Sequence, residues 1–224
     1  LEPVSVGNFG AICFSWIVLR EWGRPLRMMI RLLPVIAIFT LADARFGLSI
    51  SLLSFIAFAF AGLTGRVLVA VAPFAMIVAL TWIGYTRPDV AWDNTLRGRI
   101  LLGGQFLSKL DAYDMFALVP NFSFTADSGY AYTLVKIGLA GFAGMWALFA
   151  FAPARDEAAW RYRVFVAIYV TLLLVISNSI YSIKTAALLW YLVGALDAPV
   201  RAPAPAAIRA APARSLRRAS LRPA

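Results

Sequence analysis

The feature that most constrains the fold of this chain is a succession of long apolar runs, interrupted once by a polar stretch from Tyr85 to Tyr130. A helix of about 17 to 25 apolar residues crosses a hydrocarbon core of roughly 30 Å. Hydrophobic residues make up 62% of the chain and charged residues 14%, a balance far from that of a soluble domain. We therefore expect an all-α integral membrane protein, a polytopic bundle of transmembrane helices.

Seven apolar runs are candidates for membrane spans. They are predicted at residues 4–19, 28–42, 47–63, 67–84, 130–151, 164–179 and 185–196. The chain then divides into four helices in residues 1–84, a polar loop with one amphipathic helix in 85–130, three helices in 131–197 and a tail in 198–224. Because it begins at Leu1 with neither a methionine nor a signal-peptide n-region, we expect a fragment of a longer chain.

The basic residues divide unequally between the two sides that alternating connections define. One side holds 14 of the 21: Arg20, Arg24, Arg27, Arg31, Arg66, Arg155, Arg161, Arg163 and the six arginines of the tail. The other side holds Arg45, Arg87, Arg97, Arg99, Lys109, Lys136 and Lys184. The positive-inside rule predicts that the first side is cytoplasmic, which places the long loop in the periplasm of a bacterium whose inner membrane holds the bundle.

This asymmetry also accounts for the net charge of +10, so nucleic acid is not an expected partner. The tail after Ala198 consists largely of Ala, Pro and Arg, and we expect it to be disordered and to lie against anionic membrane lipids.

The residue inventory excludes several kinds of active site. The chain has no histidine, 11 carboxylates and a lone cysteine, Cys13. Zinc clusters, Ser-His-Asp triads and disulfides are therefore not expected, and neither is a metal or other cofactor. Any proton transfer would use Asp, Glu, Lys or Tyr.

The polar loop contains the pattern of an amphipathic helix lying on or near the membrane surface. Asp93, Asn94 and Thr95 offer N-caps. An apolar stripe follows, formed by Leu96, Ile100, Gly103, Leu107 and Leu110. Arg99 falls beside this stripe and is the better candidate for an enclosed site, whereas Arg97 points to water or headgroups. The alternative is that both arginines only anchor the helix to lipid phosphate.

A second candidate site is the helix that begins at Asp127 and Ser128. On a regular helix Asp127, Gly138 and Gly141 share one face, with Tyr130 in the first turn. A carboxylate above a strip of small residues suits a lipid-linked substrate. The alternative makes Asp127 an N-cap and the glycines a packing seam.

Two further cations lie on the same predicted side. Arg45 follows Asp43 in a short charged break between two apolar runs, and Lys184 follows a polar segment at 177–182. A charge near the membrane interior is a functional-site hypothesis by default. Pairing of Arg45 with Asp43, and snorkelling of Lys184, are the alternatives.

Over roughly residues 31–196, the order of these motifs resembles the C-terminal half of Wzy-type polysaccharide polymerases, in the superfamily of O-antigen polymerases and ligases. The resemblance rests on Arg45-Phe46-Gly47, then Gly98-Arg99, then Asp127-Ser128 followed by Gly138 and Gly141. Ligases of this superfamily carry a histidine where this chain has Asp127. Exopolysaccharide members of the xanthan-polymerase kind are the most similar.

The resemblance implies metal-independent glycosyl transfer at the periplasmic face, joining polyprenyl-diphosphate-linked oligosaccharide repeat units. Arg45, Arg99, Arg97 and Lys184 would bind the diphosphate, and Asp127 would accept the proton of the attacking hydroxyl. Ser128, Tyr130, Gly138 and Gly141 would line the lipid groove. A chain-length regulator is left open as a partner.

Three other functions remain open at this point. They are a polysaccharide ligase, a transporter or flippase component, and a non-catalytic membrane subunit of polysaccharide export.

Overall fold

The structure is a computed structural model that describes residues 3–87, 93, 95–118 and 128–198. In these ranges every regular element is a helix. The α-helices are α1 (Pro3–Glu21), α2 (Pro25–Leu41), α3 (Arg45–Phe60), α4 (Arg66–Thr86), α5 (Leu96–Lys109), α6 (Ala112–Met115), α7 (Gly129–Phe151), α8 (Glu157–Ile176) and α9 (Ile183–Asp197). Two 3₁₀ turns, η1 (Ala61–Leu63) and η2 (Ser179–Tyr181), follow α3 and α8. The tail, 199–224, lies outside the described residues. Its disorder therefore stays a prediction.

In the described part of the chain, four helices are long and apolar enough to cross a membrane: Arg45–Leu63, Arg66–Thr86, Gly129–Phe151 and Glu157–Ile176. The all-helical class and the membrane-protein character are therefore supported. The other three predicted spans correspond to α1, α2 and α9, which are not among these four, and their crossing stays a prediction. Helix α9 contains a shorter apolar segment, Ala186–Asp197.

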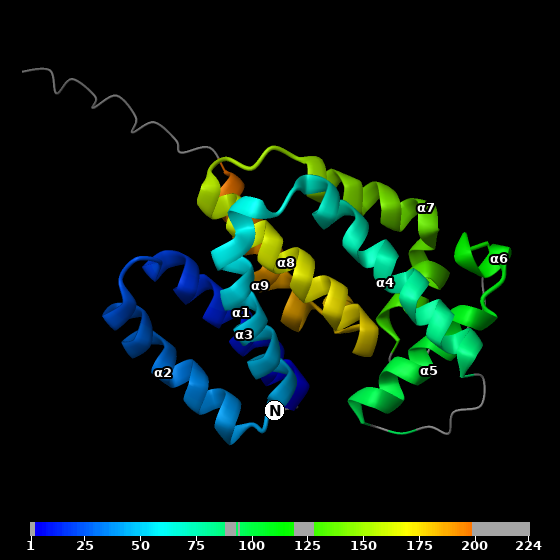
Figure 1. Cartoon of the computed structure of the whole chain (residues 1–224), viewed down its shortest axis with the longest axis horizontal. Helices are drawn as coiled ribbons and strands as arrows, with labels where there is room; N and C mark the ends of the chain where they lie inside the picture. The colour runs from blue at the N-terminus through cyan, green and yellow to red at the C-terminus, as the bar shows by residue number, and fades with distance from the viewer. Residues whose placement is uncertain (1–2, 88–92, 94, 119–127, 199–224) are drawn as a thin grey trace, which may run out of the picture.

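Helix α8 is the centre of the bundle (Figure 1). Its most apolar 18-residue stretch is 78% buried, whereas the corresponding stretches of the other three long helices are 28% to 39% buried. The reason is that α1, α3, α4, α5, α7 and α9 all pack against α8. A column of aromatic rings on α8, formed by Tyr162, Phe165 and Tyr169, is fully enclosed. From Val164 onward α8 is apolar on nearly all sides, and a helix of this kind needs such an interior position.

The predicted boundaries of this central helix are wrong at both ends. The apolar run predicts a helix at 164–179, whereas α8 begins at Glu157 and ends at Ile176. The extra N-terminal turns carry charge, which hydropathy assigns to a loop. Arg163 is nevertheless buried, because its guanidinium donates to the carbonyls of Ala152 and Pro153 and pairs with Asp197.

The turn between α3 and α4, the turn between α7 and α8, and the end of α9 meet at one end of the bundle, which we call the basic end. The Trp160 indole donates to the Ala61 carbonyl at 3.1 Å, and Arg163 pairs with Asp197. At the other end, the loop end, the start of α1 meets η2 through the bond from Asn8 Nδ2 to Ser179 Oγ, 3.1 Å long.

The described members of the two groups of basic residues thus lie at opposite ends, as the alternating connections predict. Which end faces the cytoplasm stays a prediction.

Candidate functional site

The loop end is organised by a close crossing of α4 and α5. A Cβ added to Gly84 would lie 2.0 Å from the Gly104 carbonyl oxygen, and one added to Gly104 would lie 2.5 Å from the Leu80 carbonyl oxygen. Only residues without side chains allow two helix backbones to approach so closely. Helix α5 is therefore an integral part of the bundle, packed also against α7 and α8; contact of α5 with the membrane surface stays a prediction.

The N-terminus of α5 is fixed by local hydrogen bonds. Of the three predicted caps, Thr95 is the N-cap, and its hydroxyl oxygen accepts the Gly98 N–H at 3.1 Å. The Asp93 carboxylate accepts the Thr95 hydroxyl and N–H, which lowers the pKa of this carboxyl. Gly98 is needed because a Cβ there would lie 2.2 Å from the Asp93 carbonyl oxygen.

The two arginines of α5 lie in different surroundings. Arg97 is exposed, and Arg99 is half-buried, the order that the helical pattern predicts. Arg99 Nη1 donates to the Ile176 carbonyl oxygen at 3.1 Å. Because the last carbonyls of a helix carry partial negative charge, this contact stabilises the end of α8. The proposed role of Arg97 and Arg99 in binding diphosphate stays a prediction.

The start of α7 is packed into the bundle. Ser128 is the N-cap and accepts the Ala131 N–H at 3.4 Å. Its side chain lies against α5, because a Cβ on Gly103 would be 3.3 Å from Ser128 Oγ. The fully buried Tyr130 donates its hydroxyl to the Thr171 carbonyl of α8 at 2.9 Å. Ser128 and Tyr130 thus join α7 to its neighbours, and Asp127 lies outside the described residues.

Helix α7 is kinked at Gly138, where φ is 80° and ψ is 155°. This left-handed φ favours glycine. A Cβ on Gly138 would lie 3.0 Å from the Phe116 carbonyl oxygen, so the segment after α6 occupies the space beside the kink. Gly141, one turn further on, is exposed. The expected uninterrupted glycine face is therefore wrong, because the kink redirects the helix.

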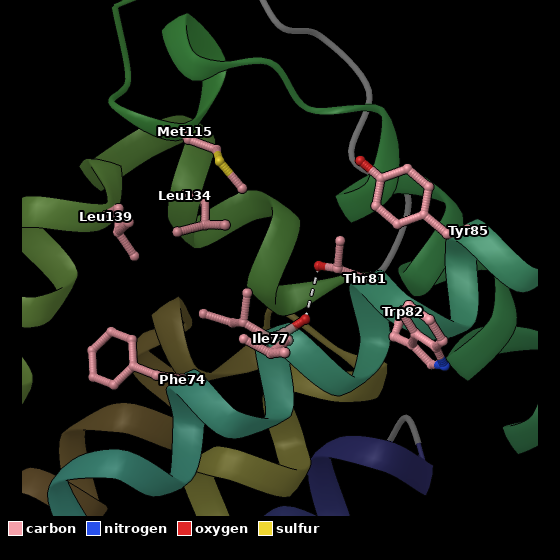
Figure 2. A pocket seen from close by; sticks show the side chains of 9 residues that line it. Phe74, Ile77, Thr81, Trp82, Tyr85, Met115, Leu134 and Leu139 are labelled. Carbon is pink, nitrogen blue, oxygen red and sulfur yellow. Dashed lines mark hydrogen bonds between the residues drawn. The ribbon is translucent and has the colours of Figure 1, made fainter.

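An apolar pocket of about 470 Å³ opens beside this kink, between α4 and α7 and next to α6. Figure 2 shows its α4 wall facing Met115, Leu134 and Leu139. The α4 wall consists of Phe74, Ile77, Val78, Thr81, Trp82 and Tyr85. Two hydroxyls belong to this wall, those of Thr81 and Tyr85. The Thr81 hydroxyl is already engaged, because it donates to the Ile77 carbonyl at 2.8 Å. Val78 and Trp82 are 69% and 70% exposed, so the pocket opens sideways from the bundle.

The α4 wall was missed by the sequence reasoning, although its signal is present. The six residues follow helical spacing from Phe74 to Tyr85. Because nearly all of α4 is apolar, this stripe does not stand out from the buried face of the same helix. An open pocket of this size with apolar walls suits an aliphatic chain.

The remaining predicted cations are not brought to this pocket by any described contact. Arg45 is exposed and pairs with Asp43, with 3.0 Å between Nε and Oδ1, which is the alternative that its sequence position left open. An exposed pair of this kind contributes little stability. The side chain of Lys184 lies outside the described part of the structure.

Comparison of the chain with models of protein families, with curated proteins and with solved structures finds no match. The function is therefore inferred from the residues and their geometry.

Proposed function

We propose that the chain is part of a membrane glycosyltransferase that polymerises polyprenyl-diphosphate-linked oligosaccharide repeat units. The reaction would take place at the periplasmic face of a bacterial inner membrane, in exopolysaccharide or O-antigen synthesis. The observation that carries the proposal is the apolar pocket at the Gly138 kink. A lipid carrier has a long aliphatic chain next to a charged diphosphate, and the pocket supplies an apolar surface at the loop end.

Arginine chemistry supports the proposed handling of the diphosphate. A guanidinium stays protonated and matches phosphate oxygens in bidentate geometry, so it can stabilise charge on the leaving group. Arg99 lies on the helix that crosses α4, which forms the long wall of the pocket. Arg45, Arg97 and Lys184 would assist at the same face.

In the proposed reaction, a sugar hydroxyl of one lipid-linked unit attacks the anomeric carbon of the growing chain. The bond from that carbon to the diphosphate breaks, and the lipid diphosphate leaves with the electron pair. The Asp127 carboxylate accepts the hydroxyl proton.

The proposal is tested in a strain that lacks its own polymerase and carries the full-length parent gene. Lipid-linked glycans are separated by size on a gel. We expect a ladder from the parent gene and single repeat units from Asp127→Asn at an equal protein level. A full ladder from Asp127→Asn would remove that residue from the mechanism. Glycans that do not depend on the gene would favour transport or scaffolding.

The arginine role is tested in the same assay. Arg99→Lys keeps the charge but removes the forked donor geometry, so we expect shortened ladders. Arg87→Lys is the matched control, because Arg87 is exposed at the same end and has no part in the proposed site. Equal ladders from both variants would return Arg99 to a purely structural role at the end of α8.

A further inference from the structure

A second pocket, of about 360 Å³, lies between α3, α4 and α8 on the way to the basic end. Its mouth includes Phe60 at the end of α3, Thr64 in the turn that joins α3 to α4, and Leu68 in the first turn of α4. Apart from Thr64 and Thr171 its lining is apolar. Phe60 and Leu68 are 57% and 62% exposed, so this pocket also opens sideways from the bundle.

The start of α4 carries a cation. Arg66 is the first residue of α4 and is exposed; in the chain it stands between Thr64 and Leu68, which both line the pocket. Its Nη1 reaches the Phe151 carbonyl at 3.5 Å, the limit for a hydrogen bond, so the guanidinium has donors to spare for an anion. The N-cap residue, Gly65, provides no side-chain acceptor for the first turn, which adds to the positive potential there.

We propose that this pocket and Arg66 together form a binding site for an anionic phospholipid. One acyl chain would occupy the pocket, and the headgroup phosphate would accept hydrogen bonds from Arg66. The charge of Arg66 favours an anionic lipid over a protein helix as the occupant. An apolar helix in the pocket would cover the mouth and leave the Arg66 charge without an anion. The site lies toward the end of the bundle opposite the proposed glycosyl transfer and does not depend on that function.

The test is native mass spectrometry of the full-length protein in detergent, titrated with phosphatidylglycerol. Arg66→Gln removes the cation, and Leu68→Trp fills the mouth of the pocket. We expect each to weaken retention of the lipid about fivefold. The matched controls are Arg27→Gln, an exposed arginine of α2, and Val67→Trp, whose native side chain is 68% exposed beside the pocket. Both controls should retain lipid as the parent does.

Three results would overturn the proposal. The first is equal retention of phosphatidylcholine and phosphatidylglycerol, with no loss in Arg66→Gln, which would indicate unspecific packing of lipid tails. The second is inorganic phosphate that binds as well as the lipid and depends on Arg66 but not on Leu68. The third is a dimer mass that Leu68→Trp abolishes, since the pocket would then hold a second copy of the chain.

Discussion

At the residue scale, a buried ion pair joins Arg163 of α8 to Asp197 of α9. The Arg163 side chain is only 4% exposed. We predict that Arg163→Met lowers the free energy of unfolding by about 3 to 5 kcal/mol, because it leaves the Asp197 carboxylate without its cation. Thermal unfolding in detergent measures this loss.

The double variant Arg163→Met with Asp197→Leu supplies the control for that prediction. Removal of both charges leaves no buried ion unpaired, so the double variant should be more stable than Arg163→Met alone. If the two losses simply added, the pair would not be the source of the stability.

Thr171 of α8 gives a second prediction at this scale. Its Oγ1 is buried and has no hydrogen-bond partner among the described residues, although it lines the α3–α4–α8 pocket. Thr171→Val removes an unsatisfied hydroxyl and keeps the shape, so we expect unfolding to become about 1 kcal/mol less favourable. A loss of thermal stability would show that the hydroxyl is satisfied in the folded protein.

At the scale of elements, the crossing of α4 and α5 depends on two facing glycines. We predict that Gly84→Ala lowers stability by about 1 to 3 kcal/mol, because the added Cβ would push against the α5 backbone. Gly144→Ala in α7 is the matched control: nothing lies within 4 Å of a Cβ there, and alanine favours the helix. Similar melting temperatures for the two variants would contradict the close crossing.

The cap of α8 gives a pH-dependent prediction. Asp156 is the N-cap, and its carboxylate accepts the Ala159 N–H at 2.8 Å. This bond, with help from Arg155, lowers the pKa of the carboxyl from 3.8. A lowered pKa gives stability that is present above the ordinary pKa and is lost as the pH falls through the lowered one.

We therefore expect Asp156→Ala to cost about 1 kcal/mol at neutral pH, and the difference from the parent to shrink in acid. Asp156→Asn keeps a capping oxygen without a titrating group, so its stability should be less dependent on pH. Melting curves between neutral pH and pH about 3 test this, and parallel curves for all three proteins would refute it.

At the scale of the whole molecule, the helices and the separation of the basic residues follow from the sequence. Apolar runs determine where helices form. The Thr95 cap could be predicted from the few residues that precede α5. The order of burial of Arg97 and Arg99 follows from helical spacing alone. These are properties that neighbouring residues decide locally.

Other features depend on partners far away in the chain and could not be predicted. The charge of Arg163 near the start of α8 can be buried because Asp197, 34 residues later, pairs with it. The kink at Gly138 lies against the segment that follows α6. The helical periodicity of residues 129–151 does not predict this kink. The pocket exists only where that kink meets the exposed stripe of α4.

If the pocket between α4 and α7 holds the lipid part of a glycan substrate that the protein polymerises, a side chain that fills the pocket should stop polymerisation. The most direct test is the glycan ladder of Val78→Trp, which fills the pocket from its open side, beside that of Val71→Trp. Val71 is one heptad earlier on the same face of α4, 51% exposed, and outside the pocket. We expect single repeat units or short ladders from Val78→Trp and full ladders from Val71→Trp at equal protein levels. Full ladders from both would contradict this role of the pocket.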